Sequence, residues 1–133
     1  MSVDCLIQQL QTLVDGLLWS SESDYPIEVV CWAARCQPLT AQDVLLLGQH
    51  SPDAAIEITS LNPLFRRVTV KHDWHSEEET AQAERFQQLK QRLSADLRDV
   101  QVYRVGEVEI TVYALGHAKD GQILGIRTQV VET

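Results

Sequence analysis

The sequence predicts an α+β fold in which helices pack on a mainly antiparallel sheet. Strand-like segments with alternating apolar and polar residues gather at the C-terminal end, and only short turns separate them. Helical periodicities with capping signals occupy much of the chain before them. The chain has 133 residues, 44% of them hydrophobic, so it fits one domain over residues 1–133 that buries its core without disulfides or a structural metal.

The N-terminal part predicts a helix, a loop and a strand. Apolar residues recur at three- and four-residue steps over residues 3–14, which indicates an amphipathic helix that Gly16 can end in a left-handed conformation. The polar run "SSESDYP" (residues 20–26) is typical of a loop. The segment "IEVVCW" (residues 27–32) is rich in β-branched and aromatic side chains and predicts a strand, whose first pairing Pro26 limits.

Two further helices begin with capping signals. Thr40 can cap a short Leu-rich helix, with Asp43 three positions later and Gly48 as its terminator. Ser76 and Glu79 form the second capping box, which opens the longest helical pattern of the chain. The apolar stripe of this long helix indicates that it covers a sheet with one side only: Phe86, Leu89, Leu93 and Leu97.

The segment over residues 51–68 fits two structures. Ile56 and Ile58 alternate as in a short strand, whereas Ser60 can cap a helical turn through Leu64 and Phe65. Both interpretations remain open from the sequence.

The C-terminal third predicts a β-meander. Its three strands are "QVYRV" (101–105), "EVEITVYAL" (107–115) and "ILGIRTQVVE" (123–132), separated by Gly106 and by the turn "AKDG" (118–121). The last strand runs almost to the end of the sequence. It can simply complete the sheet, or it can hold Glu132 and the α-carboxylate and hydroxyl of Thr133 on a rigid element, as oxygen ligands for a hard cation such as magnesium.

The charge balance limits the partners. Nineteen acidic against eleven basic residues give a formal charge of -8, which repels polyanions and favours a basic partner, so we expect no nucleic-acid binding. The N-terminal segment has no basic n-region and no continuous apolar run, so we expect neither a signal peptide nor a membrane span, and a cytoplasmic location. Cys5, Cys31 and Cys36 fit no zinc spacing and are expected as free, mostly buried thiols.

The segment "HDWHSEEE" is the best candidate for catalysis. His72 and His75 lie three residues apart with carboxylates close behind, a pattern that a metal-dependent hydrolase could use. However, both histidines precede the long helix, and the glutamates already have a capping role. No glycine-rich phosphate loop or nucleophile elbow is present, and we expect no enzyme, no cofactor and no metal of the protein's own.

Trp74 and the acidic loop are candidate binding features. Trp74 stands among polar residues, so it is either an exposed interface anchor or a ring that folds back onto the domain, whereas Trp19 and Trp32 are expected in the core. Glu22 and Asp24 lie in the loop before Pro26, and acidic loops are most often solvated surface.

The residues described above resemble the nuclease A inhibitors of cyanobacteria, which block a magnesium-dependent, sugar-non-specific endonuclease. The similarity extends along nearly the whole chain. It is carried by "DGLLWSSESDYPIEVVCW" (15–32), "DWHSEEE" (73–79), "QVYRVGEVEITVYALG" (101–116) and "TQVVET" (128–133). It implies an α-β-α sandwich similar to the plant pathogenesis-related protein fold, and a monomeric inhibitor.

The resemblance also implies which residues contact the nuclease. The family's loop glutamate, loop tryptophan and terminal threonine fall on Glu22, Trp74 and Thr133. In the family pattern the threonine reaches the catalytic metal of the nuclease and the glutamate meets a basic residue of its active site. Asp24 replaces a glutamate, and His75 replaces an aromatic residue, so the contacts around Trp74 differ from the family pattern. The predicted partner-binding set is Glu22, Asp24, His72, Trp74, His75, Glu132 and Thr133. The alternative partner is another basic protein.

Overall fold

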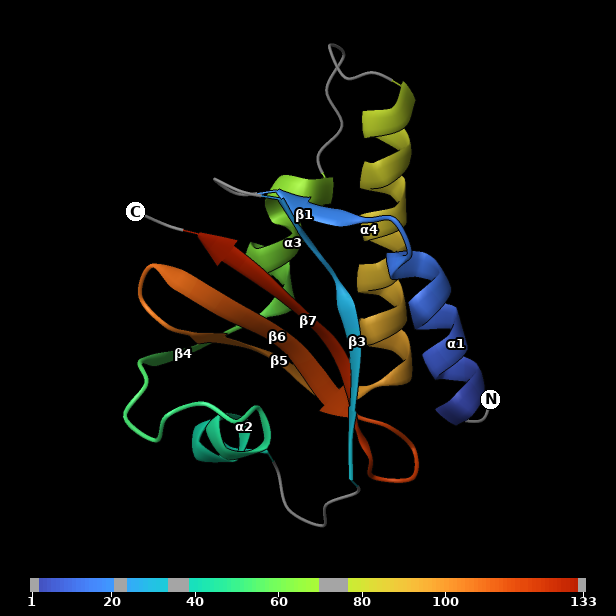
Figure 1. Cartoon of the computed structure of the whole chain (residues 1–133). Coiled ribbons are helices and arrows are strands. Elements are labelled where there is room, and N and C mark those ends of the chain that lie inside the picture. The colour runs from blue at the N-terminus through green and yellow to red at the C-terminus, as the bar shows by residue number, and fades with distance from the viewer. Residues whose placement is uncertain (1–2, 21–23, 34–38, 70–76, 132–133) are drawn as a thin grey trace.

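The structure, a computed structural model, describes residues 3–20, 24–33, 39–69 and 77–131. Helices and a five-stranded antiparallel sheet confirm the predicted α+β fold (Figure 1). The elements follow one another as α1 (Val3–Val14), β1 (Leu18–Ser20), β2 (Asp24–Pro26), β3 (Glu28–Trp32), α2 (Ala41–Leu47), β4 (Ile56–Thr59), α3 (Leu61–Thr69), α4 (Glu77–Asp96), β5 (Arg98–Val105), β6 (Glu109–His117) and β7 (Ile123–Val131).

The large sheet has the strand order β3-β7-β6-β5-β4, with antiparallel pairing throughout. The predicted meander forms its centre, and β6 and β7 pair from Glu109 opposite Val131 to His117 opposite Ile123. Because successive side chains on a strand point to opposite faces, Ile110 and Val112 face one core while Tyr113 faces the other.

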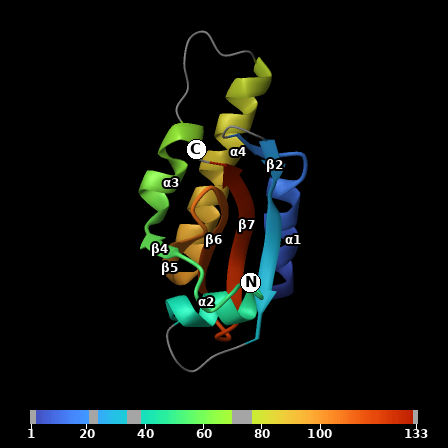
Figure 2. The ribbon, with the colours of Figure 1, turned by 60° about the vertical axis from the view of Figure 1, so that its left-hand side comes forward.

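One face of the sheet is covered by α1, α3 and α4 (Figures 1 and 2). The predicted stripe of the long helix is buried there, and Leu97 follows directly after the helix end. The opposite face carries α2, whose Val44 and Leu45 are buried against Tyr103 and Tyr113. Since α2 is short, it covers only one end of that face (Figure 1).

Several local predictions are confirmed. Gly16 has a left-handed backbone after α1 (φ 77°), and Gly48 follows the end of α2. Thr40 and Asp43 form the expected capping box, because the amide of Asp43 donates to Thr40 Oγ1 over 3.2 Å and the amide of Thr40 donates to Asp43 Oδ2 over 3.0 Å. Residue Ser76 lies outside the described residues.

Residues 51–68 contain both of the structures that the sequence allowed. Ile56 and Ile58 lie in β4, which pairs with β5 at the edge of the sheet, and α3 begins directly afterwards at Leu61. Phe65 is completely buried on α3. The two patterns were therefore consecutive elements rather than alternatives.

Two expectations were wrong. The segment 20–26 was predicted as a loop, but its described residues, 20 and 24–26, belong to β1 and β2, an antiparallel hairpin in which Leu18 lies opposite Pro26 and Ser20 opposite Asp24. The side chain of Trp19 points inward and gives this short hairpin a buried apolar contact. The polar residues of the segment do not indicate such a contact. Cys5 and Cys31 were expected to be mostly buried thiols, but both are exposed. Cys36 lies outside the described residues.

Trp19 is buried as expected, whereas Trp32 is only half-buried. The Trp32 ring packs beside Tyr113, with 5.7 Å between the ring centroids. Searching the described helices for one long and apolar enough to span a membrane yields none.

Arg85 of α4 holds the C-terminal end of α1. Its Nη2 donates to the carbonyl oxygens of Thr12 (3.1 Å), Leu13 (2.9 Å) and Asp15 (2.5 Å). The last carbonyls of a helix have no partner within the helix and carry partial negative charge, so a guanidinium there both satisfies and neutralises them. The contact joins the two helices that cover the same face of the sheet.

We therefore expect Arg85→Met to lower the free energy of unfolding by about 1–2 kcal/mol, since methionine keeps the apolar stem and loses the donors. Urea unfolding followed by circular dichroism measures this loss. Arg92→Met on the same helix is the matched control, because Arg92 only pairs with Asp96 at 3.2 Å near the surface and should change stability by less than about 0.5 kcal/mol. Equal losses in the two variants would contradict the capping role.

Candidate functional site

Of the seven predicted partner-binding residues, the structure describes Asp24. Asp24 is the first residue of β2, opposite Ser20 of β1. The remaining six residues, Glu22, His72, Trp74, His75, Glu132 and Thr133, lie outside the described residues. The structure therefore defines the elements on which these segments are mounted: the β1–β2 hairpin, the pair α3 and α4, and β7.

These mounting elements come together at one end of the molecule. In both views β7, α3 and β1 end on the same side of the molecule. β2 and α4 begin on that side as well (Figures 1 and 2). α1 begins toward the other end. Segments that are far apart in sequence thus leave the scaffold toward the same end of the molecule.

Trp19 joins the hairpin to the helix pair. Its ring centroid lies 5.5 Å from that of Phe65 on α3 and 5.5 Å from that of Phe86 on α4, with interplanar angles of 83° and 85°. Edge-to-face packing of this kind adds to the gain from burial. All three rings are buried, so one side chain of β1 fixes the hairpin against both helices.

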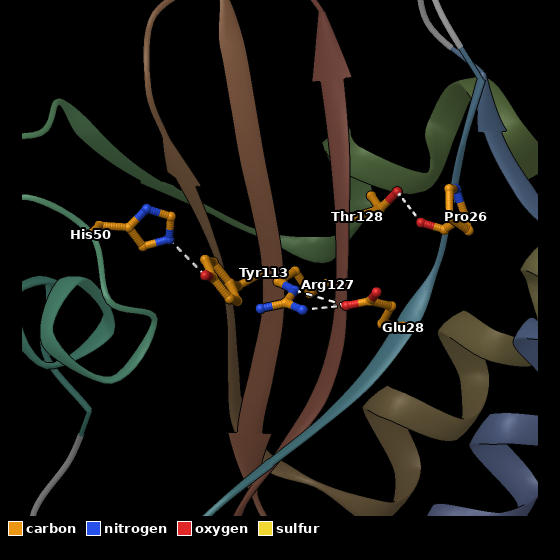
Figure 3. A network of polar contacts seen from close by, with 6 residues as sticks. All are labelled: Pro26, Glu28, His50, Tyr113, Arg127 and Thr128. Carbon is orange, nitrogen blue, oxygen red and sulfur yellow. Dashed lines mark hydrogen bonds and ion pairs between the residues drawn. The ribbon is translucent and has the colours of Figure 1, made fainter.

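Two neighbouring residues of β7 hold the hairpin and β3 from opposite faces of the sheet. The hydroxyl of Thr128 donates to the carbonyl oxygen of Pro26 over 3.0 Å. Arg127 donates from Nε to Glu28 over 3.1 Å and also contacts that carboxylate through Nη2 (Figure 3). The junction between β2 and β3 is thereby fixed to the strand that leads to the C-terminal segment.

A row of polar side chains extends from this junction across the face that α2 leaves open. Arg127 lies opposite both Glu28 and Tyr113 in the strand register, and the Tyr113 hydroxyl shares a 2.6 Å hydrogen bond with His50 Nε2 (Figure 3). Gly48 permits this contact, since a Cβ there would meet the Tyr113 oxygen at 2.5 Å. The row lines a pocket of about 410 Å³ that Tyr25 and Pro26 of the hairpin also border.

Hydrogen bonding and burial shift the pKa values of Arg127 and Tyr113 in this row. The hydrogen bond to Glu28 raises the pKa of Arg127, so the guanidinium stays charged. Burial raises the pKa of Tyr113, against a smaller opposite effect of the Arg127 hydrogen bond. Sequence reasoning missed this row. The one signal was Arg127, a charged residue within an otherwise apolar strand pattern.

Burial, and secondarily the nearby Arg127, lower the pKa of His50 from its ordinary value of 6.5. The unfolded chain therefore binds this proton more tightly than the folded one, and the contribution of His50 to stability is lost as the pH falls below about 6.5. We expect the free energy of unfolding to drop less between about pH 7.5 and about pH 5.5 in His50→Gln than in the wild type. Urea unfolding at both pH values measures this; parallel slopes would contradict it.

The described residues contain no group of three or more His, Cys, Asp and Glu side chains that could hold a metal ion. His72 and His75, on which the hydrolase alternative rests, lie outside the part of the chain that the structure describes.

The fold and the convergence of its segments define a small α+β scaffold that presents a hairpin, a helix pair and a strand end at one end of the molecule. Residues 4–133 match the sequence model of the family described as nuclease A inhibitor-like protein (NuiA), and the chain belongs to this family. Members are nuclease inhibitors rather than enzymes, so the implied partner is a nuclease. No curated protein matches the sequence.

Proposed function

We propose that this protein inhibits a magnesium-dependent, sugar-non-specific endonuclease of the nuclease A type by blocking its active site. The family match over residues 4–133 carries the proposal. The protein acts in the cytoplasm, as a monomer until it meets the enzyme.

The acidity of the chain supports this mode of action. A nuclease binds a chain of phosphates, so its cleft is positive and holds a metal ion. A protein of formal charge -8 is attracted to such a cleft, which accelerates encounter more than it sets the final affinity. Carboxylates offer oxygens to metal and arginine but contain no phosphodiester, so they occupy the site without being cleaved.

Three mounted segments make the contacts. Glu22 and Asp24 face basic residues of the enzyme, Trp74 anchors the interface with His72 and His75 beside it, and Thr133 reaches the metal with Glu132 adjacent. The hairpin, the helix pair and β7 support this arrangement because they converge at one end and are joined by Trp19 and Thr128. Contacts held at fixed separation lose less entropy on binding than flexible ones.

Titration of a purified enzyme of this type tests the proposal. Nuclease activity on double-stranded DNA should fall linearly with added protein and reach zero near one equivalent. Activity that persists at a large excess of protein over several such enzymes would contradict the proposal.

The variant Trp74→Ala should raise the dissociation constant of the complex by roughly 30-fold or more, because an interface tryptophan contributes about 2 kcal/mol or more. Calorimetric titration measures the constant, and thermal unfolding of the free variant should match the wild type. Leu46→Ala is the control, since Leu46 is an apolar side chain on α2 that is 76% exposed. A large loss of thermal stability in Trp74→Ala would instead place that ring in the core.

A further inference from the structure

We propose that Thr128 is a positioning residue, whose hydroxyl sets the β1–β2 hairpin relative to β7 and so fixes the acidic hairpin segment relative to the C-terminal one. This inference rests on the proposed inhibitory function and adds to it a residue outside the predicted contact set. Its basis is the bond from the Thr128 hydroxyl to the Pro26 carbonyl.

The hairpin lies outside the ladder of the large sheet, so its attachment there rests on side chains and on the covalent link through the buried Ile27. β1 and β2 form a two-stranded sheet of their own, and the ladder between β3 and β7 ends at Glu28 opposite Arg127. Pro26 has no amide hydrogen to donate, so its carbonyl is the polar backbone group that it can offer to β7. Thr128 binds that carbonyl directly after the ladder ends.

The burial of Thr128 indicates that its hydroxyl has a specific use. It is 4% exposed and, apart from aromatic side chains that carry a polar atom, is the one buried polar side chain among residues 3–20, 24–33, 39–69 and 77–131 for which burial is described. Valine has the same shape and would suit the apolar neighbours on this face, which include Ile126 and Val130. A buried hydroxyl is costly unless it is paired, and here the pairing fixes the hairpin.

Two other contacts near the hairpin, those of Trp19 and of Arg127, do not set the position of β2 relative to β7. Trp19 fixes β1 against α3 and α4, so it sets the hairpin relative to the helices rather than β2 relative to β7. The ion pair between Arg127 and Glu28 has side chains 42% and 56% exposed, so solvent screens it, and it acts on β3 rather than on the hairpin. The hydrogen bond of Thr128 is the directional contact that β2 itself receives from β7.

Hydrogen exchange in the free protein tests the positioning directly. In Thr128→Val the amides of residues 18–20 and 24–25 should exchange about fivefold faster, as expected for the loss of one hydrogen bond, while amides of β5 and β6 keep their rates. Thr128→Ser retains a hydroxyl and should restore protection. Thr59→Val makes the same chemical change in β4, at the opposite edge of the sheet, and should leave the hairpin amides unchanged. Unchanged hairpin exchange in Thr128→Val, or acceleration throughout the sheet, overturns the proposal.

A double-mutant cycle tests the link to inhibition. Thr128→Val should speed dissociation of the nuclease complex about fivefold in the wild-type background and have little effect beside Glu22→Gln, because the hairpin contact is then already lost. The same factor in both backgrounds would overturn the link. If the wild-type protein inhibits no such nuclease, the proposed function fails, and the exchange experiment still decides whether Thr128 positions the hairpin.

Discussion

Replacing Trp19 with alanine is expected to lower the free energy of unfolding by about 3–5 kcal/mol, the usual cost of removing a large buried aromatic side chain. Trp19 is 5% exposed and lies between two further buried rings. Its loss opens a cavity bordered by Phe65 and Phe86, and these rings come from different helices that cannot both move to fill it. The hairpin also loses its main apolar contact.

Urea unfolding of the wild type and of Trp19→Phe measures the effect even if the alanine variant does not fold. Phenylalanine keeps one ring against the helix pair, so Trp19→Phe should lower the free energy of unfolding by less than Trp19→Ala, but still by more than about 1 kcal/mol. Trp32→Ala is the matched control, because Trp32 is half-buried on the opposite face of the sheet and should cost less than Trp19→Ala. A cost for Trp19→Ala no larger than that of the control would show that the hairpin is not anchored by this ring.

Much of the fold could be predicted because its local patterns agree with the tertiary structure. The stripe from Phe86 to Leu97 is buried, and the strand patterns predict β6 and β7, whose side chains are divided between the two cores. Three-residue strands such as β1 and β2 are too short to show an alternating pattern. The hairpin could therefore not be predicted from the mostly polar residues that follow Trp19. The pairing of β1 with β2 depends on the tertiary contact of Trp19, which cannot be inferred from the local composition.

The polar row of the site could not be predicted from the sequence for a related reason. Glu28 and Arg127 are 99 residues apart, and they become neighbours only through the register between β3 and β7. A one-residue shift in that register would put Arg127 on the helix-covered face. The predicted contact residues, in contrast, came from family resemblance and composition, and the structure contributes the joined elements that carry their segments.

Extending the chain beyond Thr133 with a few glycine and serine residues is expected to weaken inhibition by roughly 100-fold or more, as for removing one partner of a buried charge pair. The new peptide bond converts the α-carboxylate into a neutral amide, which is a poorer ligand for magnesium, and the added residues obstruct the approach to the metal. β7 supports this expectation because its ladder continues to Val131, opposite Glu109. The segment therefore starts from a strand that is paired with the centre of the sheet.

The same extension placed before Met1 is the matched control, since α1 begins toward the other end of the molecule (Figures 1 and 2). It should leave inhibition unchanged, and both extended proteins should unfold at the wild-type temperature, because neither addition replaces a side chain of the core. Glu132→Gln separates the two carboxylates: if the α-carboxylate binds the metal, this variant should lose far less potency than the C-terminal extension. A C-terminally extended protein as potent as the N-terminal control would exclude metal binding by Thr133 and leave the hairpin and Trp74 as the contacts that block the enzyme.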